Sequence, residues 1–211
     1  MPSRFFVTGT DTGIGKTVTS ALLCAALDAI YWKPIQTGSR EGTDRATVMR
    51  IAALPRERTL AESYCFAPPV SPHLAARLAG KRIDLRAISL PKLLKRENLI
   101  AEGAGGVLVP VNEKQLMTAL MQRLKLPVLL VARSSLGTIN HTLLSVAALR
   151  AAHVKLRGVI MVGKRNEENR KAIERYGNVP VVGFIPPLRR LNRAALLGAY
   201  RQYFDERALA E

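Results

Sequence analysis

The stretch FFVTGTDTGIGKT, residues 5–17, runs from an apolar segment into a glycine-rich turn that ends in Gly-Lys-Thr. A turn of this kind between a strand and a helix exposes backbone N–H groups and a helix N-terminus, which both bind phosphate oxygens. Lys16 would place an ammonium at the β- and γ-phosphates of a nucleotide, and Thr17 would offer its hydroxyl to Mg²⁺. The stretch therefore predicts a phosphate-binding loop; an ordinary glycine-rich turn is the alternative.

The loop departs from the usual pattern G-x-x-x-x-G-K-[ST] in its glycine spacing and in its charge. Gly9 stands one residue early, and Thr10 occupies the position of the expected glycine. Asp11 adds an acid, which would repel a triphosphate unless a metal or a cationic substrate lay beside it. An acid in a solvent-facing turn is the alternative interpretation of Asp11. We expect the strand–loop–helix context to matter more than the glycine spacing.

Apolar and amphipathic segments alternate along the rest of the chain. PVLLVA (127–132) and GVIMV (158–162) have no polar face, as is typical of strands covered by helices on both sides. Helical segments between strands imply right-handed crossovers and a parallel sheet. We therefore predict a single α/β domain over residues 1–211, with a mostly parallel β-sheet flanked by helices, similar to P-loop NTPases. Strands are expected at 4–8, 30–36, 98–102, 127–132, 156–162 and 181–185, and helices at 16–27, 44–54, from 71 onward, 115–124, 139–152, 167–176 and 192–204; residues 83–96 are ambiguous.

Length and composition fit a soluble globular chain. The 211 residues are 48% hydrophobic, which is enough for one core. No apolar run approaches the roughly 18 residues of a membrane span, and no signal peptide is visible, so we expect a cytoplasmic protein with no membrane partner. Cys24 and Cys65 lie far apart in the sequence and are expected to be reduced thiols.

The formal net charge of +16 suggests nucleic acid, an acidic membrane surface or an anionic substrate as a partner. However, the basic residues are dispersed, with no block of like charges, and aromatic residues make up only 5% of the chain. We therefore favour a basic enzyme surface over nucleic-acid binding, and an anionic nucleotide would also be attracted to it.

Charged side chains follow two further predicted strands. Lys33, in YWKPIQTG, comes at the end of the second strand, at the edge where parallel sheets bind ligands; a surface lysine is the alternative. Glu102 ends a predicted buried strand, where an unpaired acid would be costly. The residues that follow, Gly103 to Gly106, allow close backbone approach to a phosphate or substrate, although a flexible loop is also possible.

Five segments of the chain together resemble dethiobiotin synthetases, in the order and spacing of that family: FFVTGTDTGIGKT, KPIQTGS, SPHLAA, AEGAGGVLVPV and LGTINHTLL. The resemblance covers nearly the whole chain. The form GTDTGIGKT also differs from partition-type ATPases, whose loops are richer in glycine and carry an extra lysine.

The resemblance implies ATP-dependent closure of a cyclic urea, the penultimate step of biotin synthesis. One amine of 7,8-diaminopelargonate takes up CO₂ as a carbamate, and ATP phosphorylates the carbamate to a carbamic–phosphoric anhydride. The second amine then displaces phosphate, which gives dethiobiotin and leaves ADP. Phosphoryl transfer of this kind needs positioning and charge neutralisation.

The resemblance also assigns roles to residues of this chain. Lys33 and Lys16 are the implied catalytic cations, and Lys33 would hold the carbamate and the transferring phosphoryl together. Mg²⁺ would be bound by Thr17, Asp44 and Glu102, although Asp44 could also cap its helix. The implied ATP-binding residues are Gly13, Ile14, Gly15, Lys16, Thr17, Val18, Glu102, Gly103, Ala104, Gly105, Pro186, Pro187 and Leu188. The implied substrate-binding residues are Thr12, Thr37, Gly106, Val107, Gly137, Ile139 and Asn140.

The segment LGTINHTLL lies at a two-fold interface in the family, where it completes the substrate pocket of the other subunit. The resemblance therefore implies a homodimer. His141, in this segment, and His73, in SPHLAA, are expected to be structural residues and not proton carriers.

The sequence departs from the family where the nucleotide base is expected. Many members have an Asn-Asp pair after the strand equivalent to 158–162, and the Asn reads the adenine edge. Val162 and Gly163 stand there in this chain, and Arg193 stands near a family acid. Adenine readout is therefore expected to be absent unless Asn166 bends back, and discrimination between ATP and other nucleoside triphosphates is expected to be weak.

Three other functions remain as alternatives. An amidotransferase-type ligase would need a glutaminase domain, for which 211 residues leave no room. A basic P-loop ATPase that binds DNA would explain the charge and predicts DNA-stimulated hydrolysis. A non-enzymatic nucleotide-binding regulator would give Lys33 and the segment EGAGG no reason to meet in one pocket.

Overall fold

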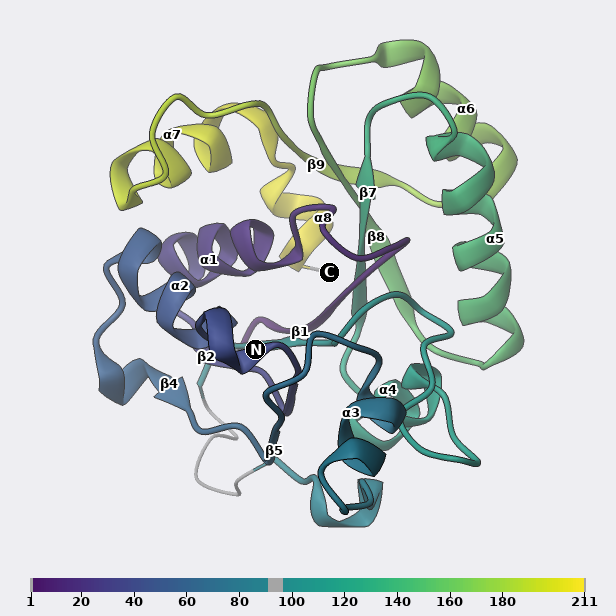
Figure 1. Cartoon of the computed structure of the whole chain (residues 1–211). Coiled ribbons are helices and arrows are strands. Elements are labelled where there is room, and N and C mark those ends of the chain that lie inside the picture. Colours follow the sequence, from purple (N-terminus) through teal and green to yellow (C-terminus); the bar gives the residue numbers. More distant parts are fainter. Residues whose placement is uncertain (1, 91–96, 211) are drawn as a thin grey trace.

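A computed structural model describes residues 2–90 and 97–210, and its centre is a seven-stranded sheet whose strands pair in parallel (Figure 1). The strand order is β4-β2-β6-β1-β7-β8-β9. The strands are β1 (Arg4–Gly9), β2 (Ile30–Trp32), β4 (Thr59–Leu60), β6 (Leu99–Glu102), β7 (Val128–Arg133), β8 (Leu156–Val162) and β9 (Val181–Ile185). The predicted α/β fold with a mostly parallel sheet is confirmed.

Helices cover both faces of this sheet (Figure 1). One face packs against α1 (Lys16–Leu27), α2 (Asp44–Ala52), α7 (Arg193–Tyr203) and α8 (Glu206–Ala210). The other face packs against α3 (Pro72–Leu78), α4 (Met117–Leu124), α5 (Thr138–Ala151) and α6 (Glu167–Gly177). None of the helices in the described part of the chain is long and apolar enough to cross a membrane.

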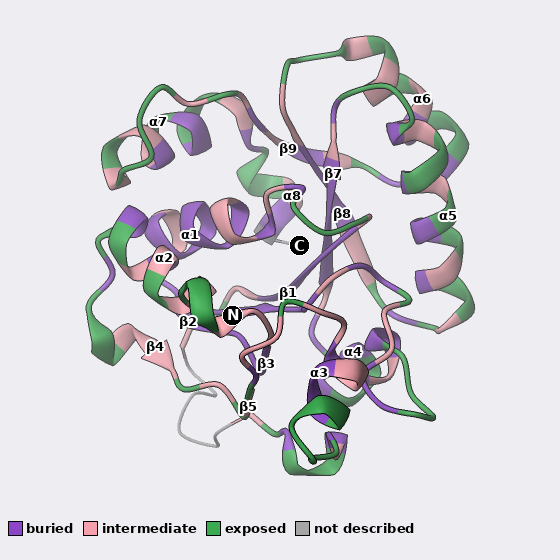
Figure 2. Cartoon of the chain, in the orientation of Figure 1, coloured by how far each residue is buried: buried purple, intermediate pink, exposed green. Residues whose placement is uncertain are grey.

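The strands are apolar on both faces because successive side chains enter two different cores. In β1, Phe6 packs in the core on the α4–α5 side, whereas Phe5 and Val7 pack in the core on the α1 side. Leu129 and Leu130 of β7 divide in the same way. The buried residues accordingly run through the middle of the molecule between two helical layers (Figure 2).

Residues 30–36, predicted as one strand, form two strands in different sheets. β2 ends at Trp32, and β3 (Ile35–Gln36) pairs instead with β5 (Tyr64–Cys65) in a second, two-stranded sheet. Pro34 lies between them and has no N–H group to donate to a sheet ladder. The break leaves Lys33 at the point where the chain departs from the main sheet.

Most other predicted boundaries are confirmed within about two residues. The helix expected to run to residue 54 ends at Ala52, because Ala53 adopts a left-handed conformation with φ of 48°. The helix expected from residue 115 begins at Met117. Short β4, β5 and α8 were not predicted. Within the ambiguous stretch 83–96, Leu85–Ala87 forms a 3₁₀ turn, and residues 91–96 lie outside the described residues.

Two smaller expectations are also confirmed. Ser71 is the N-cap residue of α3, and Pro72 occupies its first turn. Cys24 and Cys65 are both free thiols.

Candidate functional site

A cavity of about 300 Å³ opens at the carboxyl ends of β1, β2 and β6. This edge is where parallel α/β sheets bind ligands. Lys16, Lys33 and Glu102, which come from three separate segments, line the same cavity. The residues lining it are Thr12, Gly13, Gly15, Lys16, Thr17, Lys33, Gln36, Thr37, Asp44, Glu102, Ala104 and Gly105.

The glycine-rich loop joins β1 to α1, so the predicted strand–loop–helix context is confirmed. Gly13 and Gly15 have φ of 70° and 99°, a left-handed conformation that favours glycine. Gly15 is also the N-cap residue of α1, and a Cβ added there would lie 3.0 Å from the Val162 side chain. The loop therefore brings its backbone and the N-terminus of α1 to the cavity.

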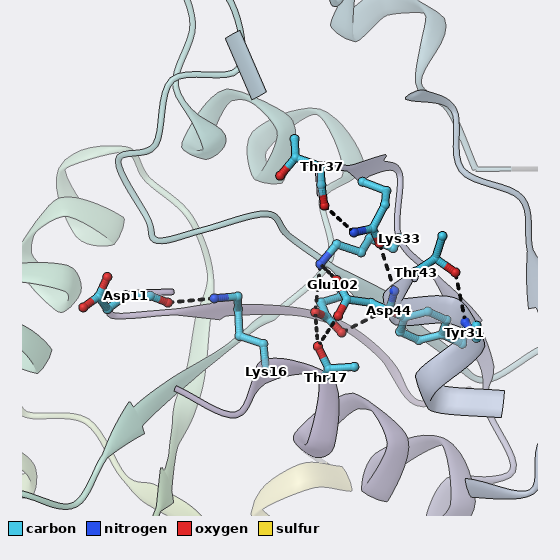
Figure 3. A network of polar contacts seen from close by, with 11 residues as sticks. Asp11, Lys16, Thr17, Tyr31, Lys33, Thr37, Thr43, Asp44 and Glu102 are labelled. Carbon is cyan, nitrogen blue, oxygen red and sulfur yellow. Dashed lines mark hydrogen bonds and ion pairs between the residues drawn. The ribbon is translucent and has the colours of Figure 1, made fainter. Parts of the chain in front are cut away.

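Lys16 is held by an uncharged partner. Its side chain is buried, and Nζ donates a hydrogen bond of 2.7 Å to the backbone carbonyl of Asp11 (Figure 3). Burial lowers the pKa of Lys16 to about 8, although the nearby carboxylate of Glu102 acts in the opposite direction. An ammonium in this position can gain stabilisation from an incoming anion.

Lys33 lies instead between two carboxylates. Its Nζ is 3.1 Å from Glu102 Oε1 and forms a second ion pair with Asp44. Burial alone would lower the pKa of Lys33, but the two carboxylates outweigh it and raise the pKa above its usual value. Burial likewise acts to raise the pKa of Asp44, and the Lys33 ammonium reverses this and lowers it. Since Lys33 is only 5% exposed, the alternative of a surface lysine is wrong.

Three oxygens that could bind a divalent cation meet beside these lysines. Thr17 Oγ1 lies 2.7 Å from Asp44 Oδ1 and 3.1 Å from Glu102 Oε1. Hydroxyl and carboxylate oxygens fit Mg²⁺, which usually also keeps water and substrate phosphate as ligands. Within the described part of the chain, no group of three or more His, Cys, Asp or Glu side chains is arranged to hold a metal without such help.

Asp44 is available for this role because another residue caps its helix. Asp44 is the first residue of α2, and the Thr43 side chain accepts the hydrogen bond from Ala46 N at 3.1 Å. The alternative in which Asp44 is the cap is therefore wrong. The helix start is also tied to the cavity wall, since Asp44 N donates to Gln36 Oε1 at 3.0 Å.

Sequence reasoning missed two buried polar residues of the site. Gln36 lines the cavity, and its Nε2 donates to the Thr37 carbonyl at 2.6 Å. Tyr31 donates its hydroxyl to Glu102 Oε2 at 3.0 Å, and burial raises the pKa of this hydroxyl well above its usual value. Tyr31 stands two residues before Lys33, a spacing that places both side chains on one face of an extended segment. That spacing is the signal that could have identified it.

Asp11 directs its carboxylate away from the lysine. The carboxylate is exposed, accepts a hydrogen bond of 2.7 Å from Thr12 N and pairs with Arg133 at 3.0 Å. Figure 3 shows the backbone oxygen of Asp11, and not its carboxylate, toward Lys16. These contacts favour the interpretation of Asp11 as a turn acid.

Several residues that the resemblance implies lie apart from the cavity. Ile14 and Val18 pack with the core on the α1 side, Gly103 is buried beside the Phe6 ring, and Val107 belongs to the other core. Gly106 faces the backbone of Gly9 and Thr10. Two further groups of described residues do not line the cavity: Gly137, Ile139 and Asn140 at the start of α5, and Pro186, Pro187 and Leu188 after β9.

The side chain of Asn166 is engaged in a helix cap. The Asn166 side chain caps α6 by accepting from Asn169 N at 3.0 Å, so it does not bend back toward the nucleotide loop. Val162 packs against Gly15, as described above. Arg193 donates to the carbonyls of Ala52 and Ala25, where it joins the ends of two helices.

The sequence of the chain is similar to those of known proteins. A family model described as an AAA domain matches residues 3–195. The chain is 47% identical over 205 residues to "ATP-dependent dethiobiotin synthetase BioD" of Rhodopseudomonas palustris, which covers 97% of this chain and 95% of that protein. It is 50% identical over 193 residues to the protein of the same name from Paramagnetospirillum magneticum, with 92% of each chain covered.

Comparison with solved structures supports only the fold. A ParA family ATPase from Chlorobium tepidum superimposes with a TM-score of 0.56 at 13% identity and covers 93% of this chain and 90% of that one. The fold is therefore that of P-loop ATPases, while the sequence relatives are much closer. Identity of 47–50% over nearly the whole length shows that the chain belongs to the dethiobiotin synthetase family.

Proposed function

We propose that this protein closes the ureido ring of dethiobiotin from 7,8-diaminopelargonate, CO₂ and ATP, with release of ADP and phosphate. Its relatives carry the name of ATP-dependent dethiobiotin synthetases. The observation that carries the proposal is the convergence of Lys16, Lys33 and the oxygens of Thr17, Asp44 and Glu102 on one cavity.

The loop and Lys16 would bind the nucleotide phosphates. Residues 13–17 lead into the N-terminus of α1, where the N-cap is Gly15, and the backbone N–H groups of a helix N-terminus favour phosphate oxygens. Lys16 has no carboxylate partner among the ion pairs of the described residues, so its ammonium can exchange the Asp11 carbonyl for a γ-phosphate oxygen. Ile14 and Val18 would hold the phosphate-binding loop in place from the core. The loop 103–105, of which Ala104 and Gly105 line the cavity, would lie beside the phosphates, and the loop 186–188 would flank the base.

Lys33 would act at the reacting atoms. Its raised pKa keeps the ammonium charged at neutral pH, where it can hold the carbamate oxygen against the γ-phosphoryl group. The carbamate oxygen attacks phosphorus and ADP leaves; the free amine then attacks the carbamate carbon, and the C–O bond to phosphate breaks. A fixed cation beside both groups stabilises the charge that develops on the transferring phosphoryl.

Thr17, Asp44 and Glu102 would hold Mg²⁺, which when bound would neutralise charge on the β- and γ-phosphates. Thr12 and Thr37 line the cavity and offer hydroxyls to the diamine substrate. Gly106 and Val107 do not line the cavity, so the remaining substrate contacts would come, in a homodimer, from residues 137, 139 and 140 of a second copy. We place this reaction in the cytoplasm.

The test is an assay with diaminopelargonate, bicarbonate, Mg²⁺ and ATP, in which dethiobiotin is detected by mass spectrometry. We expect one ADP per dethiobiotin, and no product when either bicarbonate or the diamine is omitted. The strong positive charge motivates the second candidate, a DNA-binding ATPase. Hydrolysis of ATP that DNA stimulates, without dethiobiotin, would select that candidate and reject ring closure.

A further inference from the structure

The two carboxylate oxygens of Glu102 have different surroundings. Oε1 lies 3.1 Å from both Thr17 Oγ1 and Lys33 Nζ, and both of these residues line the cavity. Oε2 accepts a hydrogen bond of 3.0 Å from the Tyr31 hydroxyl (Figure 3). Oε1 therefore faces the cavity, beside the Thr17 hydroxyl and the Lys33 ammonium, whereas Oε2 is hydrogen-bonded in the protein interior.

Tyr31 is held rigidly enough to impose this division. It lies in β2 opposite Ile100 of β6, two residues before Glu102 on the neighbouring strand. Its side chain is fully buried and packs in the core beneath α1 and α2 with Cys24, Val48 and Ile51. Turning both oxygens of Glu102 toward the cavity would leave the Tyr31 hydroxyl without its partner inside this core, which is costly.

We propose that Tyr31 is a positioning residue that restricts Glu102 to one oxygen as a metal ligand and thereby favours Mg²⁺ over larger ions. The proposal rests on the metal site of the proposed function. Mg²⁺ is small, requires regular geometry and binds few carboxylates, whereas Ca²⁺ accepts six to eight oxygens and often takes both oxygens of one carboxylate. A carboxylate that offers only Oε1 suits the smaller ion.

The variant Tyr31→Phe removes the hydroxyl and keeps the ring. Mg²⁺ and Ca²⁺ would each compete with Mn²⁺ for the protein bound to a non-hydrolysable ATP analogue, and free Mn²⁺ would be measured by electron paramagnetic resonance. We expect the preference for Mg²⁺ over Ca²⁺ to fall about tenfold in this variant, since partners of metal ligands contribute at that scale.

The matched control is Tyr64→Phe. The Tyr64 hydroxyl is hydrogen-bonded too, although it accepts its bond, from Asp84 N at 3.1 Å, and Tyr64 lies outside the cavity lining. A general loss of stability would affect both variants, whereas a change in metal preference is expected for Tyr31→Phe alone. An unchanged Mg²⁺ to Ca²⁺ ratio in Tyr31→Phe would overturn the positioning role.

A measurement on the unaltered protein covers the case in which Tyr31→Phe does not fold. The infrared carboxylate stretches of Glu102, identified by their absence in Glu102→Gln, would be compared with Mg²⁺ and with Ca²⁺ bound. A wide splitting of the two stretches with Mg²⁺ reports one coordinating oxygen and supports the proposal, and a narrow splitting reports two and overturns it.

These outcomes are separable from those of the proposed function. Selective Mg²⁺ binding that depends on Tyr31 would stand even if no dethiobiotin formed. Conversely, dethiobiotin production together with metal binding that Glu102→Gln leaves unchanged would reject the role of Tyr31 and retain ring closure.

Discussion

Lys16 and Lys33 line the same cavity, yet the protein surrounds them in opposite ways. Lys16 contacts a backbone carbonyl and has its pKa lowered to about 8 by burial. Lys33 is slightly more buried than Lys16, but it lies between two carboxylates, and its pKa is raised. The carboxylates of Asp44 and Glu102, and not the degree of burial, therefore separate the two lysines.

This difference suggests a division of labour. The charge of Lys16 is poorly compensated before a ligand arrives, so a phosphate group can stabilise it and thereby gain affinity. The charge of Lys33 is already compensated, so its contribution to nucleotide affinity should be small. Its proposed contribution is instead to the reaction, because it fixes a cation beside the transferring phosphoryl group.

The largest effect is expected from Lys33→Ala. Turnover should fall by about a thousandfold or more, because one fixed charge at the transferring phosphoryl is lost, while nucleotide affinity should change little. Single-turnover dethiobiotin formation and calorimetric binding of an ATP analogue measure the two quantities. Lys155→Ala, an exposed lysine outside the cavity lining, is the control and should retain both. Turnover in Lys33→Ala equal to that of the unaltered protein would show that Lys33 does not stabilise the transferring phosphoryl group.

Lys33→Ala also leaves Glu102 and Asp44 without their buried counter-charge, which costs about 3 kcal/mol or more of folding stability. Circular dichroism and thermal unfolding of the variant therefore accompany the kinetics. A variant that is folded at the assay temperature and inactive supports the catalytic role, and low activity in a variant that is unfolded at the assay temperature points to a structural role.

Lys16→Ala should affect both nucleotide binding and turnover. A charge-assisted hydrogen bond contributes about 2 kcal/mol, so the dissociation constant of the ATP analogue should rise about thirtyfold. The same calorimetric titration measures it, again with Lys155→Ala as the control. If Lys16→Ala bound the analogue as tightly as the unaltered protein, the proposed distinction between the two lysines would be lost.

The strands of the main sheet could be predicted because each one is marked by an apolar segment of its own sequence. The segments 127–132 and 158–162 lack a polar face, and the structure places both between two helical layers. The division of residues 30–36 into β2 and β3 could not, since β3 pairs with residues 64 and 65, and no periodicity within 30–36 records that partner.

Likewise, some parts of the site could be predicted from the sequence and others could not. Lys16, Lys33 and Glu102 each end a strand or begin a helix, so a parallel sheet brings them to one edge whatever the strand order. The bond between Tyr31 and Glu102 requires β2 to lie directly beside β6, although 66 residues separate the two strands. Such an interaction depends on strand order, which the sequence pattern alone does not reveal.

A smaller effect is expected from pH, through Lys16. Its pKa of about 8 in the unliganded protein means that it loses its charge as the pH rises through that value. Phosphate binding favours the charged form, so binding takes up a proton above pH 8, and affinity should fall by up to about tenfold per pH unit. In Lys16→Met the affinity should be flat between pH 8 and 9.5, and a matching decline in that variant would assign the titration to another group.

The smallest effect concerns the choice of nucleotide, and it separates the phosphate end of the site from the base end. Both lysines contact only phosphate and carbamate in this proposal, so they would serve any nucleoside triphosphate equally. At the base end, Val162 packs against Gly15 and the Asn166 oxygen is occupied in capping α6. A pocket that makes no specific hydrogen bond discriminates weakly, so rates with ATP, CTP and GTP at equal concentration should agree within about tenfold. A strong preference for ATP would mean that some other group reads the adenine, and the affinity assigned to the phosphate end would then be shared with the base end.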